Sequence, residues 1–176
     1  MDEQIILAVD DQGNFIGEYI PKSVGHTGSG KRHLAISVLL YNSKGEVLLQ
    51  KRKHKIFNDI WDVTGATHPL HKKDGSDESV EDATWRCLLV EYGIKDKIPL
   101  KNLGFFNYFA QYGEYCEHEH CAILVGEYNG PINLSSEVGY GYKWVSEQEF
   151  LKDIEKNPKK YSPWAQEAAK IIKSTK

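Results

Sequence analysis

Cysteine, long apolar runs and an excess of charge of one sign are all scarce in this chain of 176 residues. Its three cysteines are an odd number and none lies in a C-x-x-C pair, so we expect reduced thiols in a cytoplasmic protein. A net charge of -3 provides no broad basic surface for nucleic acid. No apolar run approaches the roughly 20 residues that cross a bilayer, and the acidic N-terminus is unlike a secretory signal. These absences predict a protein with neither a nucleic-acid nor a membrane partner.

What the chain does contain is enough apolar sequence for a full core. Hydrophobic residues make up 40% of the sequence and charged residues 27%, which is typical of globular domains. The length is that of one ordinary domain. Because no repeat, low-complexity segment or linker interrupts the sequence, we expect residues 1–176 to form a single domain.

Apolar patterning predicts strands over most of the first two thirds of the chain. Strands are expected at residues 5–9, 15–20, 34–41, 46–52, 60–63, 103–112, 117–128 and 142–145. Gly93 favours a left-handed end for a helix that begins near Glu78. Ser146 and Glu149 form a capping box for a second helix, and Pro163 suits the first turn of a third. This order predicts an α+β fold in which helices enclose a mixed sheet.

The helix that ends at Gly93 carries a specific spacing of polar residues. Glu78 is followed after seven residues by Arg86, and Glu91 and Gly93 stand at the offsets of the pattern G-x5-E-x7-R-E-U-x-E-E-x-G-U, where U is aliphatic. This stretch resembles the signature helix of the Nudix superfamily. The resemblance implies a Nudix-type α/β/α sandwich with a mixed β-sheet.

Three histidines and two glutamates outside this helix form a candidate ligand set. His26 and His33 lie in a glycine-rich loop, and His68 lies in the T-H-P loop before the signature helix. Glu117 and Glu119 are two apart on a predicted strand, so both side chains leave the same face. Nitrogen and oxygen donors of this kind suit Mn, Fe, Zn or Mg. A single histidine is more often structural than a ligand, so only the set indicates a metal site.

The order of short motifs along the chain narrows the resemblance. The motifs are K-x-x-x-H-T, R-H-L-A, NSKGEVLLQKR, W-x6-H-P, E-S-x-E-D-A-x-x-R, F-x-Y, E-x-E-x-C and Y-S-P-W. Each motif is weak alone, but in this order and spacing they resemble the type I isopentenyl diphosphate isomerases over nearly the whole chain. These isomerases are enzymes of the Nudix fold.

Metal binding and phosphate binding follow from this resemblance as expectations. In the family, the positions of the three histidines and two glutamates hold a divalent metal, for which we expect Mn²⁺ or Zn²⁺. The position of Glu91 helps to hold Mg²⁺, which docks the diphosphate. Basic residues matching Lys22, Arg52 and either Lys55 or Lys53 bind the phosphates of a small-molecule diphosphate substrate. The tryptophan matching Trp164 lies against a cationic intermediate.

Proton transfer is where this chain departs from the family. Moving a proton between two carbons of an alkene needs a donor on one face and an acceptor on the other. The family pairs a cysteine with the glutamate that matches Glu119. In this chain the cysteine position holds Ala66, which has no proton to exchange. Glu119 and Tyr108 remain as candidate catalytic residues.

Three functions are therefore open at this point. The first is isomerase-like chemistry on an isoprenyl diphosphate, which Ala66 opposes. The second is metal-dependent hydrolysis of an isoprenyl or nucleoside diphosphate. Hydrolysis needs no thiol, but Cys87 and Val90 replace two glutamates that hydrolytic relatives use. The third is binding of metal or diphosphate without catalysis.

Overall fold

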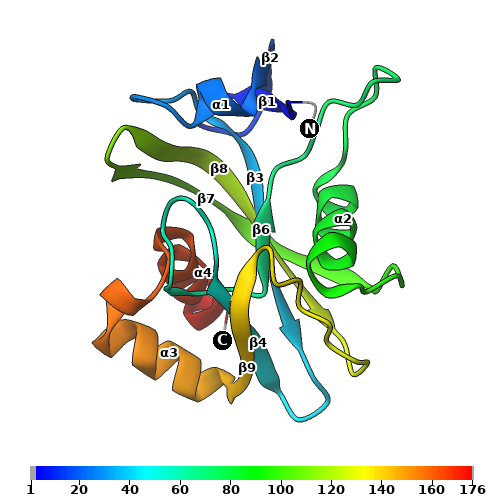
Figure 1. The fold of residues 1–176 in the computed structure, drawn as a ribbon, viewed down its shortest axis with the longest axis vertical. Helices are drawn as coiled ribbons and strands as arrows, with labels where there is room; N and C mark the ends of the chain where they lie inside the picture. The colour runs from blue at the N-terminus through cyan, green and yellow to red at the C-terminus, as the bar shows by residue number, and fades with distance from the viewer. Residues whose placement is uncertain (1–2, 176) are drawn as a thin grey trace.

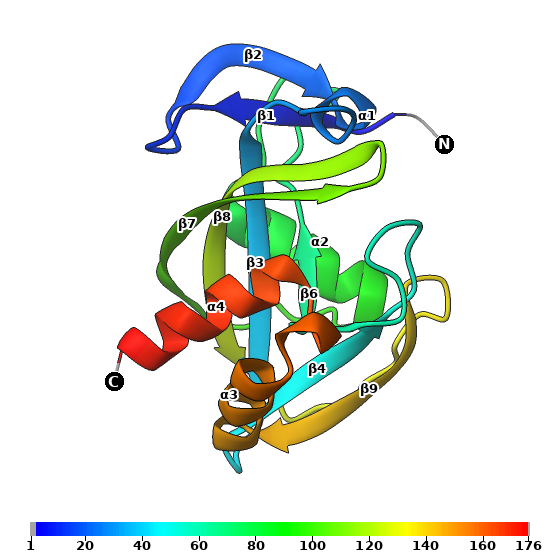
Figure 2. The same ribbon diagram turned by 90° about the vertical axis from the view of Figure 1, so that its left-hand side faces the viewer.

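A mixed β-sheet of nine strands forms the centre of the computed structural model, which describes residues 3–175 (Figures 1 and 2). The strands are β1 Ile5–Val9, β2 Phe15–Pro21, β3 His33–Tyr41, β4 Glu46–Arg52, β5 Trp61–Asp62, β6 Gly65–Thr67, β7 Leu100–Tyr112, β8 Tyr115–Glu127 and β9 Gly139–Ser146. The helices are α1 Lys22–Gly25, α2 Val80–Tyr92, α3 Glu147–Lys156 and α4 Pro163–Ser174, with a 3-10 turn at Pro158–Lys160.

Strand β3 is the centre of this sheet because it pairs with β1, β4, β6 and β8. Its pairing with β8 is parallel and sets His33 opposite Glu119. Leu39 packs into a core cluster with α3 and α4, whereas Leu40 packs into a second cluster with α2. Both faces of β3 are therefore buried, as its continuous apolar sequence predicts. The helices cover opposite faces of the sheet, which confirms the predicted α/β/α sandwich (Figure 1).

Helix α2 begins two residues later than its acidic start suggests. Ser79 is the N-cap and forms a capping box with Asp82, so Glu78 lies just outside the helix. At the other end Gly93 adopts a left-handed conformation with φ of 68°, as predicted. Glu78 is thereby free to bind Arg86 instead of capping the helix.

Helix α1, strand β6 and the 3-10 turn at Pro158–Lys160 were not predicted from the sequence, and the first two bear on the position of the site. Helix α1 is a single turn within residues 22–33, which the polar, glycine-rich sequence marks as loop. Strand β6 covers three residues and pairs with β3 opposite Ile36, Ser37 and Val38. Neither element is long enough to show a periodic pattern. No helix between residues 3 and 175 is long and apolar enough to cross a membrane.

Candidate active site

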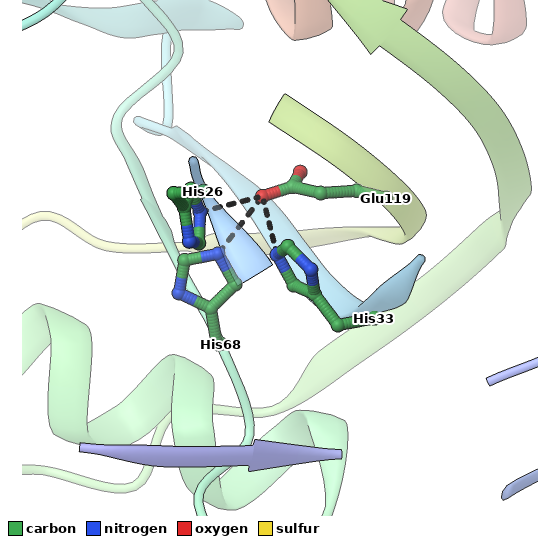
Figure 3. A group of neighbouring side chains, drawn as sticks. All are labelled: His26, His33, His68 and Glu119. Atoms are coloured by element: carbon green, nitrogen blue, oxygen red, sulfur yellow. Dashed lines mark hydrogen bonds and ion pairs between the residues drawn. The ribbon is translucent and has the colours of Figure 1, made fainter. Parts of the chain in front are cut away.

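Three imidazoles and one carboxylate converge at the end of β3 (Figure 3). Oxygen Oε1 of Glu119 lies 2.8 Å from His68 Nε2, 3.6 Å from His33 Nε2 and 4.0 Å from His26 Nε2. His33 and Glu119 face each other through the parallel pairing of β3 and β8. His26 follows α1, and His68 follows β6. All four ligand atoms lie within 4.8 Å of one another.

The hydrogen bonds of two histidines fix which ring nitrogen can accept a metal. Nδ1 of His26 lies 2.8 Å from the carbonyl oxygen of Lys22, and Nδ1 of His33 lies 2.7 Å from that of Lys31. A carbonyl oxygen only accepts, so each Nδ1 carries a proton and each Nε2 is the ring nitrogen left to face the cluster. Both Nε2 atoms are buried without a hydrogen-bond partner. This arrangement is typical of histidines that bind a metal through Nε2.

Glu117 extends the cluster along β8. Its Oε2 lies 3.0 Å from Nε2 of His26, so the carboxylate faces the ring nitrogen that points into the cluster. This contact is favourable with a proton or a cation between the two atoms. Four of the five residues predicted to bind the first metal have ligand atoms within 4.8 Å of one another, and Glu117 contacts one of the four. The group of four could hold a divalent cation. That they bind one stays a prediction.

Tyr108 and Glu119 are directly hydrogen-bonded. The two residues are register partners in β7 and β8, and the Tyr108 hydroxyl donates to Oε2 of Glu119 at 2.5 Å. Burial alone would raise the pKa of Glu119, but hydrogen bonds and charge interactions with His33, and the hydrogen bond from Tyr108, hold that pKa below its usual range. Glu119 is therefore an ionised carboxylate with a proton donor beside it.

A cavity of about 430 Å³ opens beside these residues. Its lining includes the catalytic candidates Glu119 and Tyr108, Ala66 at the family's cysteine position, and the substrate-binding candidates Lys22, Arg52, Lys55 and Trp164. The side chain of Lys53 instead donates to the Ser136 carbonyl oxygen at 2.7 Å and does not line the cavity. Of the two lysines that the sequence left open, Lys55 is the one at the cavity.

Contacts with neighbouring side chains hold Arg52 and Lys55 at the cavity, and those of Arg52 are buried. The Arg52 guanidinium donates to Oδ2 of Asp62 at 2.9 Å and lies 4.6 Å from the centre of the Trp164 ring. Asp62 in turn accepts a hydrogen bond from Ser162. Lys55 contacts the hydroxyl of Tyr115. An arginine that is held by a buried carboxylate is preorganised to meet a second anion.

Glu91 lies apart from the cavity. It accepts a hydrogen bond from Gln50 at 2.8 Å, and it does not line the cavity beside the histidines. A side chain at Gly65 would come within 3.5 Å of its carboxylate and 2.7 Å of the Cys87 sulfur, so both residues sit directly against β6 from the α2 side. Burial raises the pKa of Glu91 to about 7. Its role as a Mg²⁺ ligand stays a prediction.

Sequence reasoning missed two residues of this site. His54 lines the cavity, and its pKa is lowered to about 4 by burial and then by the charges of Arg52 and Lys22, so it is neutral. The basic run at residues 51–55 was the only signal for it. Asp62 had no local signal, because its importance comes from pairing with Arg52 across two strands.

Arg86 connects the signature helix to the loop that carries His68 of the histidine–glutamate cluster. Its guanidinium makes two hydrogen bonds of 2.8 Å with Glu78 and one of 2.7 Å with the carbonyl oxygen of His68. We expect Arg86→Lys to lower metal affinity by about 10- to 100-fold, because lysine cannot reproduce the planar fork that positions His68. Metal titration by calorimetry measures this effect.

A matched control for that variant weakens the same helix without touching His68. Asp82→Ala removes the side chain that accepts the Ser79 N–H in the capping box, so it should lower the melting temperature while it leaves metal affinity unchanged. Equal losses of metal affinity in Arg86→Lys and in this control would show that Arg86 acts only through helix stability.

Comparison with known proteins now places the chain in a family. A family model described as NUDIX domain matches residues 31–165, so the chain belongs to the Nudix family. A protein of Aliivibrio fischeri named isopentenyl-diphosphate Delta-isomerase is 35% identical over 175 residues, covering 93% of this chain and 91% of that protein. A protein of the same name from Paenarthrobacter aurescens is 33% identical over 165 residues, covering 92% and 86%. The chain is thus an enzyme of the Nudix fold with isopentenyl-diphosphate isomerases as relatives.

Solved structures agree on the fold. The crystal structure of DR0079 from Deinococcus radiodurans has a TM-score of 0.72 at 14% identity and covers 95% of this chain and 98% of that one. A MutT protein from Methanosarcina mazei has a TM-score of 0.54 at 23% identity, covering 69% and 81%. At these identities the likeness shows the fold alone. The Nudix-type fold predicted from the signature helix is confirmed.

Proposed function

We propose that this chain is a metal-dependent enzyme that transfers a proton to or from an isoprenoid diphosphate in the cavity of about 430 Å³. The observation that carries the proposal is the meeting of three groups of residues in one place. These groups are the histidine–glutamate cluster, the cations Lys22, Arg52 and Lys55, and the aromatic ring of Trp164. Together they offer a site for a metal, a site for a diphosphate and a surface for an apolar tail.

The proposed enzyme would hold two kinds of divalent metal ion. His26, His33, His68, Glu117 and Glu119 would hold a divalent Mn²⁺ or Zn²⁺, and Glu91 would contribute to a Mg²⁺ site for the diphosphate. A bound divalent ion would supply positive charge at these positions. A cytoplasmic location belongs to the same proposal and is supported by three cysteines that are free and buried.

Side chains that line the cavity would bind the phosphates, move the proton and stabilise positive charge. Lys22, Arg52 and Lys55 would bind the phosphate oxygens through charge-assisted hydrogen bonds. Glu119 and Tyr108 share a hydrogen bond and can hold or move one proton at the carboxylate oxygen Oε2. The Trp164 ring can stabilise positive charge that develops on the hydrocarbon. Because Ala66 supplies no second proton group, we expect exchange of a proton on one face to outpace isomerisation.

Hydrolysis of the diphosphate is the second candidate, and Ala66 is the observation that favours it, since attack by water needs no thiol. Two side chains oppose it. Val90 is 65% exposed and Cys87 is buried against Gly65, and both occupy positions where the Nudix signature has metal-binding glutamates. Proton transfer therefore agrees better with the groups that this chain retains.

One assay separates the candidates. Purified protein with Mg²⁺ and Mn²⁺ is incubated with isopentenyl diphosphate in D₂O and followed by proton and phosphorus NMR. We expect deuterium to enter the substrate or its allylic isomer, and a chelator should stop this until metal is returned. Release of phosphate would instead support hydrolysis. Saturable binding with neither exchange nor phosphate release would support a protein that only binds diphosphate.

A further inference from the structure

A second cavity, of about 340 Å³, is lined mostly by residues of strand β9 and helix α3 and shares no lining residue with the first. Three lysines line it, one from the strand and two from the helix: Lys143, Lys152 and Lys156. Val145 and the buried Phe150 supply an apolar floor. A cavity with an apolar floor and convergent charged groups has the character of a small-molecule site.

None of the three lysines forms a direct ion pair with another residue of the described range 3–175. Lys143 Nζ lies 4.1 Å from the ring centre of Trp61, and its charge also interacts at longer range with Glu149 and Asp153. Lysines of the neighbouring helix α4 are paired directly, Lys170 with Glu167 and Lys173 with Glu155. The ammonium groups at the second cavity therefore keep donors that no carboxylate takes up at ion-pair distance.

Helix stability does not explain this arrangement. Lys152 and Lys156 are one turn apart on α3, and like charges at this spacing repel. Lys156 lies in the last turn, where the helix dipole favours a cation. Lys152 lies too far from the end of the helix to gain the same benefit. An anion in the cavity would remove the repulsion.

The two acidic residues of the cavity are engaged elsewhere. Glu149 accepts hydrogen bonds from the backbone and hydroxyl of Ser146 as part of the capping box of α3. Asp153 accepts one hydrogen bond from Tyr161 and one from Asn157. Both carboxylates are thus held by local hydrogen bonds, and neither closes a direct ion pair with a lysine of the cavity, although both interact electrostatically with Lys143.

We propose that the second cavity binds a phosphorylated small molecule with at least two negative charges through Lys143, Lys152 and Lys156. Three ammonium groups can donate several charge-assisted hydrogen bonds to the oxygens of one phosphate or diphosphate group. The apolar floor formed by Val145 and Phe150 would accommodate an uncharged part of the ligand. This proposal does not depend on the reaction assigned to the first cavity.

Tryptophan fluorine NMR distinguishes the two cavities. Protein labelled with 5-fluorotryptophan has one reporter at each site, because Trp61 contacts Lys143 and Trp164 lines the first cavity. Inorganic pyrophosphate is added at constant ionic strength, with orthophosphate in a parallel titration. We expect a saturable shift of the Trp61 resonance, assigned with Trp61→Phe, at lower concentrations of pyrophosphate than of orthophosphate.

Double variants test whether the Trp61 response depends on the lysines of the second cavity. Lys152→Ala combined with Lys156→Ala should weaken the response of Trp61 at least tenfold and leave that of Trp164 unchanged. Lys170→Ala combined with Lys173→Ala removes the same amount of charge from α4, and it should change neither the Trp61 response nor the Trp164 response. Lys55→Ala should reduce only the Trp164 response. A Trp61 shift that never saturates, or that survives unchanged in the first double variant, would overturn the proposal.

Discussion

Glu119→Gln should lower metal-dependent proton exchange into isopentenyl diphosphate by about 100- to 10,000-fold, the usual contribution of a positioned acid or base. The carboxylate contacts His68 and lies near His26 and His33. It also accepts a hydrogen bond from the hydroxyl of Tyr108. Glutamine keeps the size of the side chain but has no negative charge and cannot take a proton at Oε2. Deuterium incorporation measured by NMR gives the rate.

Two further measurements separate catalysis from folding in this variant. Metal-dependent stabilisation, measured as the rise of the melting temperature on adding Mn²⁺, should also decrease because one ligand loses its charge. Glu127→Gln is the matched control, since Glu127 is an exposed residue at the far end of the same strand. If Glu119→Gln keeps a third or more of the exchange rate, the role given to this carboxylate is wrong.

Ala66→Cys should raise formation of the allylic isomer by two to four orders of magnitude, about the range for one general acid or base. Ala66 lines the same cavity as Glu119 and Tyr108, and its backbone is held in β6 opposite Ser37 of β3. A thiol has an ordinary pKa of about 8.5, so it can exchange a proton near neutral pH. Isomer and exchanged substrate are counted separately by NMR.

Ala66→Ser provides the comparison for this gain. Serine adds one atom at the same position, but its hydroxyl is far less acidic than a thiol, so it should give little or no isomer. Both variants should keep the metal-dependent rise in melting temperature. An Ala66→Cys protein that keeps this rise and forms no more isomer than the original chain would show that residue 66 does not face the reacting carbons.

Local sequence determined the elements that have a strong pattern. The apolar run before Tyr41 predicted a strand buried on both faces, and Gly93 predicted the left-handed end of α2. Spacing by two predicted that Glu117 and Glu119 share a face of β8. Each of these inferences depends on neighbours a few residues away in the chain, which is the range over which periodicity carries information.

Contacts between segments that are distant in the chain could not be predicted from local sequence patterns. The four-residue helix α1 gives His26 its position, yet it is too short for a helical period. The ion pair of Arg52 with Asp62 depends on the pairing of β4 with β5, and Glu91 lies outside the cavity because it sits against β6 from the α2 side. The lysines of the second cavity come from β9 and α3, and only the packing of these elements shows that they meet.

The parallel pairing of β3 with β8 also bears on how the protein folds. The two strands are far apart in the chain, and closing so large a loop slows folding because its entropy is lost before the contacts form. During synthesis on the ribosome, His33 emerges well before Glu119. The residues proposed as ligands can therefore come together only after β8 has left the exit tunnel, while β9, α3 and α4 still follow it in the chain.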